Sequence, residues 1–259
     1  MVSLIPRHPL GRRLVYELIH LVRANRTALN PGFSPVQPAI SNDPDFAKEQ
    51  RQIQLYAELL ALLPVDDEQW QKASVLEVAA AGGGGLRYLR KRYQPREAIG
   101  IELSIFAAWR GRRRGLDIRQ GDASKLPFHD CHFDCVLCID ALSYFPQEAF
   151  FRELHRVTKP GGRVMFGQGM LSPPDQIPHY FRHFGDIAGL QVESFHDLAS
   201  GVRQSIIENA RQMPPIVRQW PQRLRVRAVE NFFMLPGGQR YEQWHSGDFR
   251  FGVAIMRRS

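Results

Sequence analysis

The sequence predicts an α/β fold in which a mostly parallel β-sheet is covered by helices on both faces. Between residues 73 and 196, short apolar runs alternate with helical patterns, and this alternation is typical of parallel sheets buried on both sides. The chain of 259 residues, 44% hydrophobic and 23% charged, is long enough to bury one sizeable core and has an ordinary globular composition.

Four regions follow one another along the chain, and none repeats another. We expect a helical N-terminal cap, a sheet-forming core, a helical lid inserted before the last strand, and that strand itself. They are residues 1–72, 73–196, 197–248 and 249–259.

The cap is expected to hold two helices and a loop. Arg7–Asn25 is basic and amphipathic; we interpret it as a helix over the active site, with an organelle transit segment or a membrane-surface helix as alternatives. The proline-rich stretch Asn30–Pro38 follows as an ordered loop. Asp43 and Pro44 then have the pattern of an N-cap and first helical position, and the helix that they open ends at Pro64.

The strands are predicted from short apolar runs bounded by turn residues or helical patterns. They are Ser74–Val78, Ala98–Glu102, Asp117–Arg119, Phe133–Ile139, Gly162–Gly167, Gln191–Phe195 and Phe249–Met256. The lid precedes the last of these strands. It is therefore expected near the carboxyl ends of the strands, where open α/β sheets bind ligands.

Charge and cysteine content restrict the class of protein. The 34 Lys+Arg exceed the 26 Asp+Glu, which gives a net charge of +8 and favours anionic partners. No base-flipping motif or RNA-binding module accompanies that charge, so nucleic acid is not the expected partner. Three cysteines without framework spacing suit a reducing cytoplasm, and no apolar run reaches the roughly 20 residues of a membrane span.

Two groups of residues have the spacing of metal ligands. Cys131, Cys135 and Cys138 have the spacing of an iron–sulfur motif. However, Cys135 and Cys138 are three apart in a predicted strand, so they point to opposite faces. His179 and His183 are four apart on a predicted helix but have no third ligand at a suitable spacing. No metal is therefore expected.

Three motifs follow successive strands and indicate a nucleotide-like ligand. After Glu77, the small residues from Ala79 to Gly85 form a turn that lets the backbone approach a ligand and adopt positive φ; alone it is a weak signal. Glu102 ends the next strand, where a carboxylate can accept both hydroxyl hydrogens of a ribose or be a plain surface residue. Asp122 follows the third strand, where its carboxylate can accept a hydrogen bond from an adenine amino group.

Taken in order, these motifs resemble the class I methyltransferases that depend on S-adenosylmethionine (SAM). The segments are VLEV with the small-residue loop, GIELS, GDASKLPF, FDCVLCIDAL and FFRELHRVTKPGGRV. The flanks LNPGFSP, RQIQLYAELL, DLASGVRQSI and YEQWHSGDFRFGVAIMRR are similar to phthiotriolone, glycopeptidolipid and rifamycin-type O-methyltransferases.

The resemblance implies a Rossmann-like sheet with an antiparallel last strand, and SAM as the cofactor with S-adenosylhomocysteine as its product. It also implies an enzyme that methylates a hydroxyl, amine or carbon of a natural-product, lipid or polyketide-like small molecule. We expect a cytoplasmic protein, either a monomer or a homodimer.

The same resemblance implies the roles of single residues toward the cofactor. Glu77 and the loop through Ala79, Ala81 and Gly83 face the methionine part of SAM, and Glu102 takes the ribose hydroxyls. The other expected contacts are Leu103 on the adenine, Asp122 and Ala123 at its edge, Asp140 beside the methionine end and the substrate, and Phe33 as a cover.

Two departures from the family pattern bear on function. Ala79 and Ala81 stand where the family has glycines, and a Cβ at positive φ costs roughly 1–2 kcal/mol. Ser143 stands where related enzymes often have a histidine base, and serine is a poor base at pH 7. These departures motivate an alternative function, a cyclase, isomerase or silent binding subunit that no longer transfers methyl.

If a base is needed, three residues are candidates for it. They are Asp140, Tyr144 and His196. An acceptor such as an amine or activated carbon needs no strong base, because methyl transfer is an in-line displacement that positioning alone accelerates.

Overall fold

The computed structural model describes residues 14, 17, 20, 21, 26–171, 176–212 and 234–259. Most of the helix expected over residues 7–25 lies outside this set, but Leu14, Glu17, His20 and Leu21 are described and are helical. The middle of the expected lid, residues 213–233, also lies outside it.

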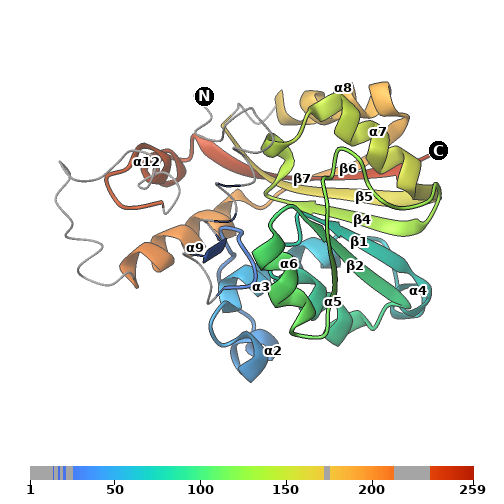
Figure 1. The fold of residues 1–259 in the computed structure, drawn as a ribbon. Helices are drawn as coiled ribbons and strands as arrows, with labels where there is room; N and C mark the ends of the chain where they lie inside the picture. Colours follow the sequence, from blue (N-terminus) through green and yellow to red (C-terminus); the bar gives the residue numbers. More distant parts are fainter. Residues whose placement is uncertain (1–13, 15–16, 18–19, 22–25, 172–175, 213–233) are drawn as a thin grey trace.

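Seven strands form one sheet in the order β3-β2-β1-β4-β5-β7-β6 (Figure 1). β1 to β5 pair in parallel, and β7 pairs antiparallel with both β5 and β6. The prediction of a mostly parallel sheet with an antiparallel last strand is therefore confirmed. The strands are β1 Ser74–Val78, β2 Glu97–Glu102, β3 Asp117–Gln120, β4 Phe133–Ile139, β5 Thr158–Leu171, β6 Leu190–Asp197 and β7 Phe249–Arg258.

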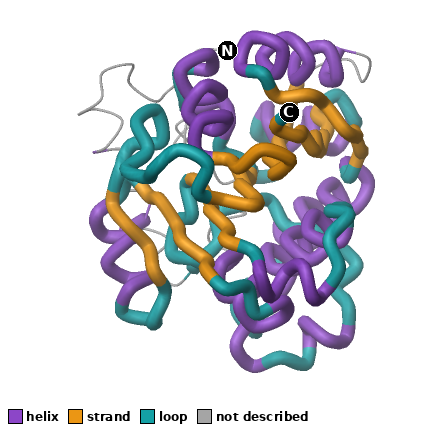
Figure 2. The backbone as a smooth tube through the Cα atoms, turned by 90° about the vertical axis from the view of Figure 1, so that its right-hand side faces the viewer, coloured by secondary structure: helices purple, strands orange, loops and turns teal. Residues whose placement is uncertain are grey.

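Helices cover both faces of this sheet, as Figures 1 and 2 show. α3, α5 and α6 pack into the core cluster on one face, and α7 and α8 pack into the cluster on the other. The helices are α2 Pro38–Ser41, η1 Pro44–Phe46, α3 Gln50–Ala61, α4 Asp67–Lys72, α5 Gly84–Tyr93, α6 Ile105–Arg112, η2 Leu142–Tyr144, α7 Gln147–Val157, α8 Gln176–Ala188, α9 Ala199–Arg211 and α12 Gln239–Ser246.

The alternation of side chains along β4 places the two strand cysteines on different faces of the sheet. Cys135 is buried in the first of these core clusters and Cys138 in the second, so the two thiols lie on opposite faces as predicted. Burial raises the pKa of the Cys135 thiol to about 12. Among the described residues, no group of three His, Cys, Asp or Glu side chains is placed to hold a metal ion.

The single helix expected from Asp43 to Pro64 is wrong. Asp43 does cap a helix, since its carboxylate accepts from the Asp45 N–H at 3.0 Å, but that helix is the short η1, and α3 begins only at Gln50. The chain leaves helical geometry at Glu49, whose φ is −147°. There the Glu49 carboxylate turns inward and accepts from the backbone N–H of Thr27 at 2.7 Å.

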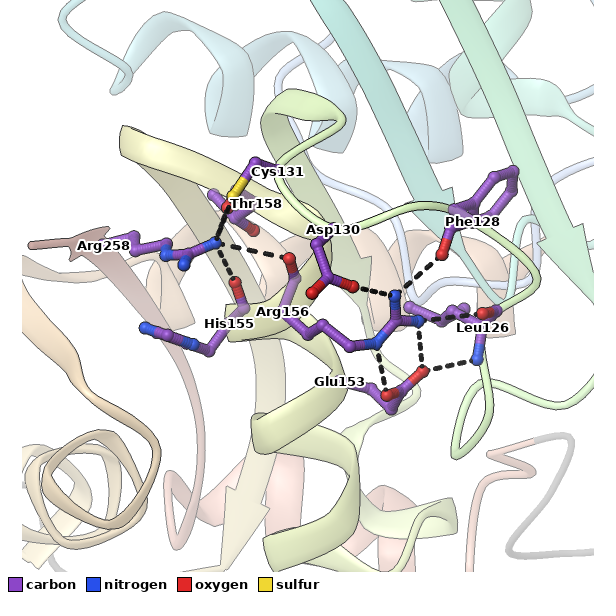
Figure 3. Close-up of polar contacts among 9 residues, drawn as sticks. All are labelled: Leu126, Phe128, Asp130, Cys131, Glu153, His155, Arg156, Thr158 and Arg258. Atoms are coloured by element: carbon purple, nitrogen blue, oxygen red, sulfur yellow. Dashed lines mark hydrogen bonds and ion pairs between the residues drawn. The ribbon is translucent and has the colours of Figure 1, made fainter.

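The loop between β3 and β4 is fastened to α7 by one arginine (Figure 3). Arg156 donates to Glu153 at 2.8 Å and to Asp130 at 2.7 Å. It also donates to the carbonyls of Leu126 at 3.0 Å and Phe128 at 2.8 Å. This loop therefore has a fixed shape next to the predicted cofactor contacts at its start.

None of the described helices combines the length and apolarity that a bilayer span requires.

Candidate active site at the carboxyl edge of the sheet

The turn after β1 keeps left-handed backbone geometry at both alanines. Ala79 has φ +56° and Ala81 φ +49°, and Gly83 follows with φ +82°. The Ala81 N–H donates to the Glu102 carboxylate at 2.9 Å, which links the ends of β1 and β2. The alanines thus adopt the conformation that suits glycine, with the strain that a Cβ brings there.

The glycines that follow serve a contact with the N-terminal cap. The backbone N–H groups of Gly82 and Gly84 both donate to the Thr27 carbonyl, at 3.0 and 3.1 Å. A Cβ on Gly84 would lie 2.8 Å from the Ala28 Cβ, so only glycine lets the two segments lie this close. Sequence reasoning assigned these glycines to the ligand and missed their partner, because Thr27 lies more than fifty residues away.

Glu77 lies at the end of β1 and is 1% exposed. Its Oε1 accepts from the Tyr56 hydroxyl at 2.5 Å, while its Oε2 has no hydrogen-bond partner among the described residues. Burial, with a smaller contribution from the nearby charge of Glu102, raises the pKa of Glu77 to about 8, although the hydrogen bond from Tyr56 lowers it. A buried acceptor atom without a donor fits a ligand ammonium group.

Glu102 ends the neighbouring β2 and is also buried. Its Oε1 accepts from the Ser104 N–H at 2.8 Å and lies 3.7 Å from His20 Nε2 of the N-terminal helix. Burial raises the pKa of Glu102 to about 6, although hydrogen bonds from Ser104 and Ala81 lower it. Because β1 and β2 are parallel neighbours, Glu77 and Glu102 lie at the same edge of the sheet, as predicted.

The remaining predicted cofactor contacts on β2 and β3 lie at this edge as well. Leu103 is half-buried and Ala123 is packed in the core. Asp122 Oδ1 accepts from both the N–H and the hydroxyl of Ser124, at 2.9 and 2.6 Å, which fixes its carboxylate in a local turn. Their roles toward an adenine ring remain predictions.

Phe33 comes from the N-terminal loop and packs on α9. A Cβ on Gly201 would lie 2.1 Å from the Phe33 ring, so the ring sits directly on the backbone of that helix. The Phe33 N–H donates to the Arg51 carbonyl at 2.9 Å. The ring is thus fixed between the cap and α9; that it covers the cofactor remains a prediction.

A second cluster forms where β4 and β5 end and β7 begins. Asp140 follows β4 with φ +53°, and its Oδ1 accepts from the Gly169 N–H at 3.3 Å. A Cβ on Gly169 would lie 2.7 Å from the Phe249 ring, 3.4 Å from Trp244 and 3.5 Å from Asp140 Oδ1. Burial raises the pKa of Asp140 to about 6, and the charge of Arg240 opposes this rise.

Two members of this cluster come from α12 and were not predicted. The Arg240 guanidinium lies 5.1 Å from the centre of the Phe249 ring. Trp244 is 1% exposed, and its Nε1 has no hydrogen-bond partner among the described residues. Trp244 lies in the YEQWHSGDF flank and Arg240 directly precedes it, but no spacing in the sequence connected them to Asp140.

The other candidate bases differ in where the fold places them. Tyr144 ends η2, four residues after Asp140, and packs against the core cluster that contains α7 and α8, while Ser143 is exposed. His196 lies on β6, 3.0 Å from the Ser194 hydroxyl. Because β5 and β7 separate β6 from β4, the sheet does not bring His196 to Asp140.

Comparison with known proteins finds a domain match that includes Glu77, Glu102 and Asp140. Residues 76–166 match the family described as a methyltransferase domain. A fatty-acid O-methyltransferase of Mycolicibacterium smegmatis is 32% identical over 184 residues, 66% of this chain and 64% of the relative. A phthiotriol/phenolphthiotriol dimycocerosates methyltransferase of Mycobacterium ulcerans is 34% identical over 143 residues, 52% of this chain and 51% of the relative. The chain thus spans 64% and 51% of the lengths of these relatives.

Solved structures share the fold over nearly the whole chain. The geranyl diphosphate C-methyltransferase of Streptomyces coelicolor, solved with S-adenosylhomocysteine, has a TM-score of 0.70 at 16% identity and covers 98% of this chain and 99% of its own. The [4+2]-cyclase SpnF has a TM-score of 0.72 at 18% identity, with 96% of each chain covered. Identities this low show the fold alone. The match of residues 76–166 to a methyltransferase domain and the fold of these solved structures agree with one another.

Proposed function

We propose that the chain transfers the methyl group of SAM to a carboxylate oxygen of a lipid-like small molecule and releases S-adenosylhomocysteine. The main support for SAM binding is the pair of buried carboxylates, Glu77 and Glu102, at neighbouring strand ends of a methyltransferase domain. We further propose a cytoplasmic protein that works as a monomer or homodimer.

The cofactor supplies an electrophilic methyl group on a sulfonium. Glu77 Oε2, buried and without a donor, accepts hydrogen bonds from the ammonium of the methionine part. Glu102 accepts from the ribose hydroxyls with the oxygen lone pairs that Ser104 and Ala81 leave available. Ala79 and Ala81 hold the turn beside the methionine part, and Asp122 receives the adenine amino group.

The proposed acceptor, a carboxylate, follows from the absence of a histidine base at position 143. Ser143 replaces the histidine expected of related enzymes, but a carboxylic acid is already ionised at pH 7 and needs no base. Arg240 and the unpartnered Trp244 N–H are the hydrogen-bond donors that hold a carboxylate beside Asp140. Methyl transfer then depends on positioning, which supplies much of the rate in such displacements. The printed name of the Mycolicibacterium relative, a fatty-acid O-methyltransferase, supports this choice of acceptor.

The cofactor assignment is tested by calorimetric titration with SAM and S-adenosylhomocysteine. We expect wild-type protein to bind both, and Glu102→Ala to bind SAM at least about tenfold more weakly because hydrogen bonds to a buried carboxylate are lost. Glu97→Ala, at the other end of β2, is the matched control and should keep wild-type affinity. A folded wild-type protein that binds neither compound would contradict the proposal.

The acceptor assignment is tested by mass spectrometry of products formed from fatty acids, fatty alcohols and fatty amines. We expect methyl esters from the acids, and a raised KM for the acid in Arg240→Gln with unchanged SAM affinity. Arg211→Gln, on the exposed end of α9, is the control and should leave the KM unchanged. Methylation of the alcohol or amine in place of the acid would overturn the acceptor and leave the cofactor assignment standing.

The alternative function, a fold that no longer transfers methyl, is not favoured. This alternative was suggested by Ala79, Ala81 and Ser143. Both alanines, however, adopt the positive φ that the turn needs, and a carboxylate acceptor makes a base at position 143 unnecessary. The cyclase among the fold neighbours shares only the fold at 18% identity, whereas the curated relatives are named methyltransferases.

A further inference from the structure

Exposed apolar side chains gather at one place on the described surface. Five large hydrophobic side chains are exposed among the described residues, and four of them belong to the N-terminal helix and α6. Leu14 is 63% exposed, Leu21 58%, and Ile105 and Trp109 48% each. Scattered exposed hydrophobics are ordinary, but neighbouring ones mark an interaction surface.

A hydrogen-bonded contact joins these two helices. The Glu17 carboxylate accepts from the backbone N–H of Ile105 at 2.6 Å and of Phe106 at 3.2 Å, at the start of α6. Leu14 and Leu21 are three residues before and four residues after Glu17, and therefore lie on the same side of their helix. The four exposed apolar side chains thus lie around one helix–helix contact.

Arginines border this apolar surface. Arg110 lies 5.6 Å from the centre of the Phe106 ring, and Arg113 lies 5.7 Å from that of Trp109. Arg112 and Arg114 complete a run of basic residues at the end of α6. Within the described part of the chain, none of these four guanidiniums forms an ion pair with a carboxylate.

We propose that this surface, formed by Leu14, Leu21, Ile105, Trp109 and the arginines that follow Trp109, docks on an anionic lipid bilayer. Leucine and tryptophan side chains insert at the boundary between headgroups and acyl chains, and arginines bind lipid phosphates. An anionic bilayer thus binds both the apolar side chains and the arginines of this surface, whereas a purely charged or a purely apolar partner would bind only one of the two.

The charge distribution argues against two other occupants. A second copy in a symmetric dimer would bring the same patch against itself, and the four arginines of one protomer, which form no ion pair with a described carboxylate, would face those of its partner. A nucleic acid would use the arginines but would leave Leu14 and Leu21 in water, since it is bound mainly through its phosphates.

The location of the surface matches its proposed use. Glu17 also accepts from the Ser104 hydroxyl at 2.7 Å, and Ser104 holds the Glu102 carboxylate through its N–H. The docked surface therefore lies beside the proposed cofactor site, a location that, on the proposed function, suits an enzyme with a lipid acceptor. Docking itself requires no methyl transfer and is tested without it.

The test is co-sedimentation of the full chain with two kinds of vesicles, one of phosphatidylcholine alone and one of phosphatidylcholine mixed with phosphatidylglycerol. We expect partitioning onto the anionic vesicles only, weakened by salt. Ile105→Ser/Trp109→Ser and Arg110→Gln/Arg113→Gln should each reduce the partition coefficient by roughly tenfold or more.

The matched control is Arg92→Gln/Arg152→Gln, which removes the same charge at exposed arginines of α5 and α7 and should partition like wild type. Circular dichroism and unchanged SAM affinity in the Arg110→Gln/Arg113→Gln variant establish that the fold and the cofactor site are intact.

Three outcomes of the vesicle and oligomeric-state measurements overturn the docking proposal. They are the absence of binding to anionic vesicles, an equal loss in the control variant, and a wild-type dimer that Ile105→Ser/Trp109→Ser converts to a monomer. A chain that binds RNA through the same arginines but leaves the vesicles in solution would overturn it as well. None of these results would affect the cofactor assignment, which fails only if SAM does not bind.

Discussion

At the scale of single residues, the carboxylate of Glu77 undergoes a large change in surroundings when the chain folds. Its folded-state pKa of about 8, against 4.5 for the free group, arises first from burial. The folded state therefore holds the Glu77 proton to higher pH than the unfolded chain does. The contribution of this group to the free energy of unfolding falls as pH rises from about 4.5 to about 8, and is constant above that range.

Glu77→Gln should therefore gain stability relative to wild type as pH rises through this interval. The glutamine has nearly the same shape but does not ionise, so the cost of burying a charge disappears. Urea unfolding at several pH values from about 5 to about 8 measures the difference.

Glu153→Gln provides a control of opposite sign. Arg156 lowers the pKa of Glu153, so this variant should lose stability at neutral pH and approach wild type as the solution is acidified. A difference between Glu77→Gln and wild type that does not change with pH would contradict the pKa assigned to Glu77.

Residue-level prediction from the sequence succeeded where a motif lies on one strand end. Glu77 and Glu102 were placed correctly near the ends of neighbouring strands because each lies in or directly after a recognisable apolar run, and their roles toward the cofactor remain predictions. Arg240 and Trp244 were missed because their relation to Asp140 arises only when α12 packs at the start of β7, about a hundred residues further along the chain.

At the scale of elements, the turn between β1 and α5 contains two strained alanines. Ala79 and Ala81 both have positive φ, whereas Ala80 between them does not. The strain that the sequence predicted at these two positions is therefore present in the fold, and the turn retains its shape in spite of it.

Replacing both strained residues, in Ala79→Gly/Ala81→Gly, should raise the free energy of unfolding by about 1–2 kcal/mol and tighten SAM binding, because glycine adopts positive φ without steric cost. Thermal unfolding and calorimetric titration measure the two effects. Ala80→Gly is the matched control and should destabilise by about 1 kcal/mol, since glycine there only adds freedom to the unfolded chain. A double variant no more stable than wild type would show that the turn is not strained.

The element that the sequence misjudged, the helix after Asp43, failed for a similar long-range reason. Glu49 suits a helix by its own propensity. The fold instead uses its carboxylate to hold Thr27 and Arg87, which lie on either side of it in the chain. A local pattern contains no information about such partners.

At the scale of the whole molecule, the proposed cofactor site draws on the cap, the core and the contacts between them. Thr27 holds the glycine turn, His20 lies beside Glu102, and Phe33 sits on α9. A ligand bound there contacts parts that are distant in sequence, so its binding energy should stabilise the molecule as one unit.

SAM at one hundred times its Kd should therefore raise the free energy of unfolding by about 2.7 kcal/mol, and the melting temperature by roughly 5–10 °C for a chain of this size. Differential scanning fluorimetry with increasing SAM measures the shift, and free methionine at the same concentration serves as the control. A shift confined to part of the unfolding transition would indicate that the cap unfolds separately from the core.

The architecture of the whole molecule was the part most accessible to sequence reasoning, because alternating strand and helix periodicities and a series of motifs in a fixed order point to one fold. The proposed docking surface was accessible only in part, because a membrane-surface helix was one alternative for residues 7–25 but nothing in the sequence connected that helix to α6. Leu14 and Trp109 lie about ninety-five residues apart in the sequence, and only the packing of α6 against the N-terminal helix shows that they face solvent together.

The position of β7 has a consequence for the order in which the sheet is completed during synthesis. β7 lies between β5 and β6 and pairs with both, yet it follows β6 by about fifty residues. When a ribosome has released β6, neither β6 nor the outer edge of β5 has a strand to pair with, and both edges are open to other chains. The sheet closes only after β7 has emerged, so the nascent chain is most prone to aggregate while the segment between β6 and β7 is being made.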